Sequence, residues 1–175
     1  AALHQEVRIN SSDPVNVPGE ILTKGPNVLL GYYKNEEDTG QTIDKDGWFH
    51  TGDLGLMDED GNVFIKGRSK NMLLGSNGQN IYPEEIEDKL NSLPLVSECL
   101  VIQSGEKLIA LVHPDYDEAQ NLGLNADDLK NIMEENRTQL NTIVPAYCKV
   151  AEIRIQEEEF EKTPKKSIKR FLYTE

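Results

Sequence analysis

The sequence predicts an α+β fold in two parts, a β-rich segment over residues 1–67 and a small mixed α+β domain over residues 72–175. Short apolar runs bounded by glycine and turn residues fill the first part, as they do in sheets of short strands. In the second part, apolar residues at helical spacing alternate with strand-like runs. A sheet as short and edge-rich as the first part would be unusual alone, which indicates a piece of a larger β-subdomain.

Three strands are expected in the first part, over residues 6–9, 19–23 and 61–65. The first alternates polar and apolar residues, and the other two each begin at a glycine. Two aspartate-containing tetrapeptides that end in glycine, residues 44–47 and 58–61, are turn signals. The first part therefore reads as strands and turns.

Two helices and three strands are expected in the second part. One helix opens at Pro83, followed by acidic residues that favour a first turn, and Asn125 is a good N-cap for the other. The inward faces predicted for these helices are Ile86, Leu90 and Leu93 in the first, and Leu129, Ile132, Met133 and Leu140 in the second. The strands are expected over residues 95–103, 108–113 and 150–155.

Composition excludes several classes of protein. The formal net charge of −13 argues against a general binder of nucleic acid or anionic membranes. No apolar run approaches the ~20 residues of a membrane span, and the N-terminus lacks the pattern of a signal peptide. We therefore expect a cytoplasmic protein, either free or peripheral to a membrane. Cys99 and Cys148 are expected to be buried thiols, with a disulfide as the alternative. The three histidines are too far apart in the sequence to indicate a metal site, so none is predicted.

Three motifs follow one another in a characteristic order: residues 47–55 (GWFHTGDLG), 66–71 (KGRSKN) and 78–87 (GQNIYPEEIE). Together they resemble the ANL superfamily of adenylate-forming enzymes, and most closely its long-chain fatty acid–CoA ligase branch. Residues 19–21, and 31–33 with Asp38 and Thr39, fit an earlier motif of that family. The resemblance implies the end of the large N-terminal domain (1–67), a hinge (68–71) and the mobile C-terminal lid domain (72–175).

The resemblance implies roles for three residues near the hinge. Taken alone, residues 51–53 would be a turn, Arg68 a surface charge and Lys70 a solvated loop lysine. In the family, the aspartate at Asp53 accepts both ribose hydroxyls of ATP, which suits a carboxylate facing a vicinal diol. The arginine at Arg68 contacts the ribose or a phosphate, and the hinge lies at Lys70.

The loop over residues 75–80 would line the channel for coenzyme A in the family. Gly78 would allow close approach of the backbone. Asn80 stands where many relatives carry a basic residue, so this chain departs from the family there. Gly78 and Asn80 are the predicted coenzyme A contacts.

The tail, residues 162–170 (KTPKKSIKR), matches the family's late motif except at one position. The resemblance implies a lysine that bridges the acid and the α-phosphate during adenylation, but Ser167 occupies that place. Lys169 and Lys166 flank it, and either could supply the cation. If the tail is extended, Lys169 lies on the side of Ser167, which favours Lys169. The plain alternative is a basic, partly disordered chain end.

The implied function is that of the C-terminal portion of an ATP-dependent ligase. With ATP, Mg²⁺ and coenzyme A, the full-length enzyme would form acyl-AMP from a fatty acid and transfer the acyl group to coenzyme A. The phosphate loop and the acyl pocket of such an enzyme are absent here, so a missing N-terminal domain of the same protein is an expected partner. The alternatives are an adenylation domain of another ANL enzyme, a non-catalytic regulatory or interaction module, and an unrelated acidic α+β domain.

Overall fold

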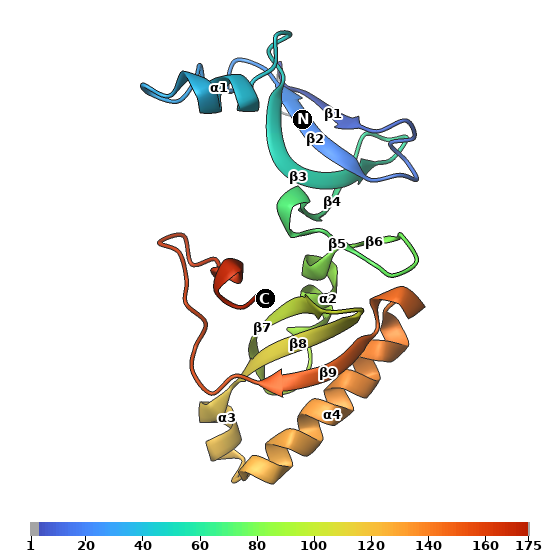
Figure 1. Ribbon diagram of the computed structural model, residues 1–175, viewed down its shortest axis with the longest axis vertical. Coiled ribbons are helices and arrows are strands. Elements are labelled where there is room, and N and C mark those ends of the chain that lie inside the picture. Colours follow the sequence, from blue (N-terminus) through green and yellow to red (C-terminus); the bar gives the residue numbers. More distant parts are fainter. Residues whose placement is uncertain (1–3, 175) are drawn as a thin grey trace. The chain divides into compact units, whose positions relative to one another are not determined.

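The computed structural model describes residues 4–174, and the chain divides after Asn71 into two compact units (Figure 1). The division falls at the end of the segment expected to be a hinge, residues 68–71. A division into units does not by itself demonstrate a pivot, so the hinge remains a prediction. The fold class is the mixed α+β arrangement that the sequence indicates.

The first unit contains one antiparallel sheet of four strands in the order β1-β2-β3-β4. Its core is small and lies on β1 and β2, where Ile9, Ile21 and Leu22 are buried. A short helix, α1, precedes β3. The bounds are β1 Glu6–Asn10, β2 Gly19–Lys24, α1 Glu36–Thr42, β3 Phe49–Met57 and β4 Val63–Arg68.

Strand β3 and helix α1 were not among the expected elements. Residues 49–57 contain two glycines and an aspartate, a composition that strands usually avoid. The segment is nevertheless a strand because it pairs with β2 on one side and β4 on the other. Helix α1 is held by a local cap instead, since the Asn35 side chain accepts a hydrogen bond from the Asp38 backbone N–H.

The second unit contains a hairpin and a three-stranded sheet in which β8 pairs antiparallel with β7 and parallel with β9. Asn125 caps α4 in a complete capping box, as expected from the sequence. Helix α3 was not expected. The bounds are η1 Ser69–Asn71 (in the first unit), β5 Leu73–Leu74, β6 Asn80–Ile81, α2 Pro83–Leu90, β7 Val96–Ser104, β8 Lys107–Pro114, α3 Tyr116–Asn121, α4 Ala126–Ile143, η2 Ala146–Cys148, β9 Val150–Ile155 and η3 Arg170–Leu172.

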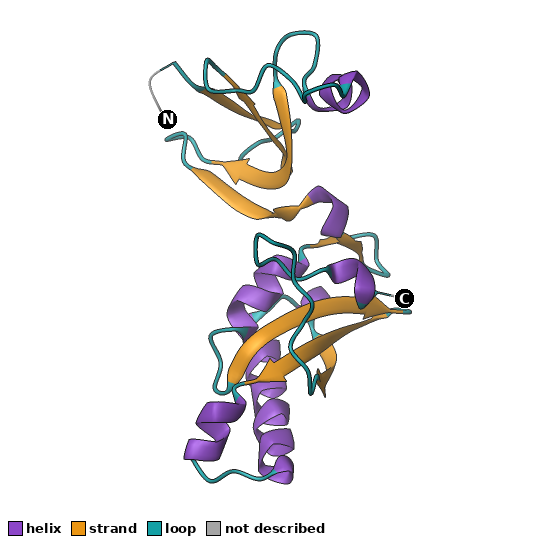
Figure 2. Ribbon diagram, turned by 90° about the vertical axis from the view of Figure 1, so that its left-hand side faces the viewer, coloured by secondary structure: helices purple, strands orange, loops and turns teal. Residues whose placement is uncertain are grey.

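The two faces of this sheet are covered by different parts of the chain (Figure 2). Helices α2 and α4 pack on one face, where alternate residues of β7 and β8 such as Val101 and Ala110 are buried in the main core. The opposite face carries a second cluster, in which Leu100, Ile102 and Ile109 pack against Phe160, with Ile168 and Tyr173 beside them. The C-terminal segment is therefore a packed layer of the fold and not a loose tail.

Candidate functional site

The predicted nucleotide-binding residues Asp53 and Arg68 face each other on neighbouring strands. They are directly paired in the β3–β4 register. The Arg68 Nη1 atom lies 2.7 Å from Asp53 Oδ1. Both side chains remain partly exposed, at 33% for Asp53 and 47% for Arg68. An exposed pair of this kind adds little stability, and a carboxylate and a guanidinium open to solvent are groups that a ligand can contact.

Gly52, just before Asp53, has a backbone conformation that other residues rarely adopt. Its φ is +71°, and a Cβ placed there would lie 3.4 Å from Arg68 Nη2. A side chain at this position would therefore strain the backbone, although the space beside the guanidinium would admit a Cβ. The glycine allows β3 to bend so that Asp53 and Arg68 meet.

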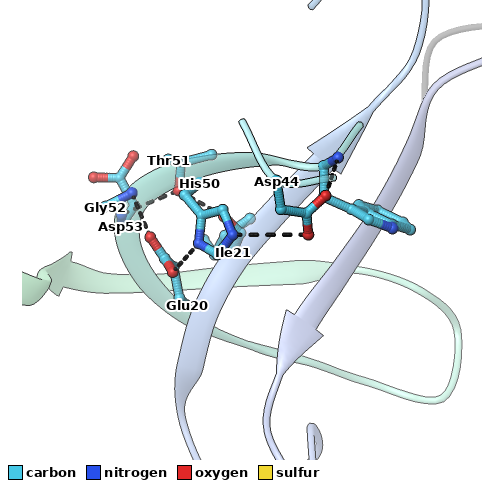
Figure 3. A network of polar contacts seen from close by, with 8 residues as sticks. Glu20, Ile21, Asp44, His50, Thr51, Gly52 and Asp53 are labelled. Carbon is cyan, nitrogen blue, oxygen red and sulfur yellow. Dashed lines mark hydrogen bonds and ion pairs between the residues drawn. The ribbon is translucent and has the colours of Figure 1, made fainter. Parts of the chain in front are cut away.

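A network of polar contacts with β2 holds this part of β3 in place (Figure 3). One oxygen of the Glu20 carboxylate accepts a hydrogen bond from the Gly52 N–H at 3.0 Å, and the other accepts from His50 Nδ1 at 2.7 Å. The Thr51 hydroxyl donates to the Ile21 carbonyl at 2.7 Å and accepts from the Asp53 N–H at 3.0 Å. Residues 50–53 are thus fixed to β2 by side chains as well as by the strand ladder.

The far side of His50 faces a second carboxylate. Its Nε2 atom lies 3.9 Å from Asp44 Oδ2, and the backbone N–H of Trp48 donates to the same carboxylate. That hydrogen bond from Trp48 lowers the pKa of Asp44, with His50 as a smaller contribution. The sequence predicted neither a metal site nor a nucleophile–histidine site at His50, and it did not indicate this supporting role. Its place directly before Thr51-Gly52-Asp53 was the available signal.

Lys70 lies in the single turn η1, exposed to solvent, at the end of the first unit. A polar, exposed side chain on a short turn is compatible with a change of backbone conformation. Its role as the hinge stays a prediction.

The predicted coenzyme A residues lie on the β5–β6 hairpin of the second unit. Gly78 has φ +77°, and its N–H donates to the Gly75 carbonyl. A Cβ added at Gly78 would point into open space, so the backbone there can be approached closely. Asn80 is exposed at the start of β6. The contacts of both residues with coenzyme A remain predictions.

A cavity of about 250 Å³ lies beside this hairpin. The side chains around it include two lysines, one glutamate and a tyrosine that is 42% exposed. Positive charge is the sign that a phosphate-bearing ligand requires. The lining residues are Gly75, Ser76, Asn77, Ile81, Gln103, Glu106, Lys107, Leu108, Ala146, Tyr147, Lys149 and Ala151.

The tail does not run extended past Ser167, as the preference for Lys169 assumed. Residues 163–167 form a turn in which the Thr163 N–H donates to the Ser167 carbonyl and the Lys166 N–H donates to the Thr163 carbonyl, both at 2.8 Å. Lys166 is exposed in this turn, with φ +63°. Lys169 instead places its Nζ 3.0 Å from Glu161 Oε2. The geometry removes the reason for preferring Lys169.

Both cysteines are buried and unpaired. Burial disfavours the thiolate and raises the pKa of both thiols, to about 11 for Cys148. Neither has the low pKa of a reactive cysteine.

Residues 4–174 hold no cluster of three or more histidine, cysteine, aspartate or glutamate residues that could bind a metal ion. The carboxylate nearest the predicted nucleotide site, Asp53, is already paired with Arg68. Within the same described residues, no helix is both long and apolar enough to cross a membrane.

Comparison with known proteins gives one family match, the C-terminal domain of AMP-binding enzymes, over residues 70–175. A 2-succinylbenzoate–CoA ligase from Bacillus cytotoxicus is 48% identical over 94 residues, which cover 54% of this chain and 19% of the relative. A probable acyl-activating enzyme 9 from Arabidopsis thaliana is 38% identical over 165 residues, or 91% of this chain and 28% of the relative. This chain thus spans well under a third of either protein.

Among solved structures, the adenylation domain of a carboxylate reductase from Mycobacterium chelonae matches with a TM-score of 0.82 at 20% identity. The match covers 96% of this chain and 29% of that structure. At this identity the likeness concerns the fold alone.

Proposed function

Because this chain belongs to the family of AMP-binding enzyme C-terminal domains, we propose that it is the C-terminal portion of an ATP-dependent acid–CoA ligase. The observation that carries the proposal is the Asp53–Arg68 pair, held beside Gly52 by Glu20 and the β3–β4 register. A carboxylate can accept hydrogen bonds from the two hydroxyls of a ribose, and a guanidinium beside it can donate to the adjoining phosphate.

The first half-reaction joins an acid to AMP. A carboxylate oxygen of the acid attacks the α-phosphorus of ATP, the bond to the β-phosphate oxygen breaks, and pyrophosphate leaves. Asp53 holds the ribose. Arg68 orients the Asp53 carboxylate and adds positive charge near the phosphate. Such positioning and charge neutralisation supply most of the catalysis in phosphoryl-group chemistry.

The second half-reaction transfers the acyl group to a thiol. The sulfur of coenzyme A attacks the acyl carbon, its proton is lost, and AMP leaves. Support comes from the β5–β6 hairpin with Gly78 and Asn80, and from Lys107 and Lys149 around the adjoining cavity. These lysines could bind phosphate groups of coenzyme A. They would supply the positive charge that many relatives carry at the position of Asn80.

Different observations point to different acids. The branch that the motifs resemble points to a long-chain fatty acid, while a relative that is 48% identical is named for 2-succinylbenzoate, an aromatic acid. Both retain the carboxylate that adenylation requires, and this chain contributes nothing recognisable as an acyl pocket. We therefore assign the substrate to the class of carboxylic acids. The panel of acids in the test below distinguishes a long-chain from an aromatic acyl group.

The test uses the full-length enzyme with Mg-ATP, labelled pyrophosphate and a panel of fatty and aromatic acids. Acid-dependent exchange of pyrophosphate into ATP is the expected result, followed by acyl-CoA once coenzyme A is added. Lack of exchange with every acid would contradict the proposal.

One observation favours a second candidate, a non-catalytic regulatory or interaction module. Ser167 stands where the family's motif carries lysine, and its hydroxyl is neutral and short. The two candidates differ in the same assay, because a module of this kind would show no exchange even with Ser167→Lys.

A further inference from the structure

A buried ion pair joins the C-terminal segment to the first helix of the second unit. Glu87 of α2 is only 9% exposed, and one of its oxygens contacts Arg170 Nη2. The other oxygen accepts a hydrogen bond from the Val101 N–H at 2.6 Å. Arg170 Nη1 donates to the Val101 carbonyl at 3.1 Å. Three segments distant in sequence thus meet at one point.

Stability alone is a poor reason for such a pair. Removing two charges from water is costly, and well-packed apolar residues often serve as well or better. The cost is visible at Glu87, where burial raises the pKa of the carboxyl and the nearby Arg170 guanidinium opposes that shift. The pair instead restricts the position of Arg170, because its planar guanidinium is bound to both a carboxylate and a backbone carbonyl.

The remainder of the segment is anchored on both sides of the turn at 163–167. Before the turn, Lys162 Nζ lies 2.6 Å from Glu98 Oε1, and Phe160 is buried at 3% exposure. After it, the Tyr173 hydroxyl accepts a hydrogen bond from the Glu161 N–H at 2.8 Å. The exposed turn with Lys166 and Ser167 therefore projects from a fixed base.

We infer that Glu87 and Arg170 form a clamp that positions the tail turn, and with it the cationic side chain used in adenylation. The inference rests on the proposed function for its chemistry. Neither residue is catalytic, since both contact the protein and not the reacting atoms. They act on the α-phosphate indirectly, by positioning the turn at 163–167, which ends three residues before Arg170. Disrupting the Glu87–Arg170 pair should therefore slow the first half-reaction and leave the second almost unchanged.

The test compares Glu87→Gln and Arg170→Gln with the unchanged full-length enzyme in two assays. Pyrophosphate exchange should fall by about 10- to 100-fold, because a misplacement near 1 Å is enough for such a loss. Thioester formation from preformed acyl-AMP should change by less than about threefold, because the family's second step does not use the tail cation. Arg170→Lys, which keeps one charge but not the planar fork, should recover part of the exchange activity.

Two control variants separate positioning from general damage. Arg137→Gln removes an arginine from an exposed pair with Glu134 on α4 and should leave both half-reactions unchanged. Met133→Ala weakens the main core on the opposite face of the sheet and should lower the melting temperature without separating the two assays.

A direct readout keeps the clamp testable if the enzyme shows no exchange at all. Amide hydrogen exchange over residues 161–170 should rise in Glu87→Gln while the amides of α4 stay protected. Unchanged protection of the tail in Glu87→Gln would overturn the clamp whatever the activity. So would an equal loss of both half-reactions in an active enzyme. Absence of exchange in the unchanged enzyme, with the tail loosened by Glu87→Gln, would reject the proposed function and keep the clamp.

Discussion

Single residues determine where a nucleotide could be held in the first unit. Asp53 gains its position from three sources: the pairing of β3 with β4, the left-handed backbone of Gly52, and the Glu20 carboxylate that binds the Gly52 N–H. The Arg68 guanidinium then fixes the direction of the Asp53 carboxylate. A site assembled in this way should be sensitive to the loss of one oxygen acceptor.

Replacement of Asp53 by alanine in the full-length enzyme is expected to raise the KM for ATP or lower kcat/KM by about 10- to 100-fold. The loss corresponds to a charge-assisted hydrogen bond worth about 1.5–3 kcal/mol. Steady-state kinetics of pyrophosphate exchange measures it. Asp60→Ala, which removes an exposed carboxylate from the β3–β4 turn, is the matched control. Unaltered ATP kinetics in Asp53→Ala would refute the assignment.

The thiol of Cys148 is expected to react slowly in the native enzyme. Burial raises its pKa to about 11, so at pH 8 only about one molecule in a thousand carries the reactive thiolate. Since the shift is upward, the alkylation rate should keep rising with pH towards 11. Peptide mass spectrometry after iodoacetamide treatment at several pH values would follow this, with the urea-unfolded protein as reference. A native rate equal to the unfolded rate would disprove it.

The proposed hinge and the proposed tail cation both lie in short turns and not in the long helix α4. The turn η1 links the two units, and the turn at 163–167 presents the tail lysines. Each is exposed and small, so each can be altered without opening a core. The next two predictions concern these turns.

Lys70→Pro in the full-length enzyme is expected to spare adenylation and to impair thioester formation. Proline holds φ near −65° and lacks an N–H, so a pivot at this position would stiffen. Lys70→Ala removes the charge but keeps the backbone free, and it should affect both steps little. The two half-reactions are measured separately, with pyrophosphate exchange for the first and preformed acyl-AMP for the second. Equal loss of both steps in Lys70→Pro would count against a hinge here.

Lys166 is now the stronger candidate for the tail cation. Its side chain is exposed in the turn, whereas Lys169 is engaged by Glu161. We expect Lys166→Ala to reduce pyrophosphate exchange by about 10²- to 10³-fold and Lys169→Ala to reduce it less, because an adenylation transition state needs a cation that is not already engaged. Lys165→Ala removes the neighbouring exposed lysine and serves as control. Full exchange activity in both Lys166→Ala and Lys169→Ala would leave the tail without a catalytic lysine.

At the scale of the whole molecule, the residues proposed for the two half-reactions are divided between the two units. The first unit holds the residues proposed for ribose, and the second holds those proposed for coenzyme A and the tail cation. Neither unit contains a phosphate loop rich in glycine, serine and threonine or a recognisable acyl pocket. Chemistry at the α-phosphate would need these groups together in a site from which water is excluded.

The isolated chain of 175 residues is accordingly expected to show no pyrophosphate exchange with any acid. The assay uses Mg-ATP, labelled pyrophosphate and the same panel of acids. The full-length enzyme under identical conditions is the positive control. Acid-dependent exchange by the chain alone, above background, would show that its own residues complete the site.

The sequence by itself determined the elements with strong local signals. Proline and acidic residues open α2, the Asn125 cap starts α4, and short apolar runs mark β7, β8 and β9, because these features depend on neighbours in the chain. The family could be inferred in the same way, from motifs a few residues long. Asp53, Arg68 and Lys70 could be chosen as candidates without any structure.

The tertiary structure alone decided what depends on partners far apart in the sequence. Strand β3 forms despite its glycines because two strands pair with it, and Glu20 supports Gly52 across a gap of 32 residues. The C-terminal segment packs against the sheet, and there Arg170 pairs with Glu87, 83 residues earlier in the sequence. Local propensity cannot predict this pairing, because the two residues lie far apart in the sequence. The attraction between the two charges becomes strong only when folding removes most of the surrounding water, and that removal has its own cost in free energy.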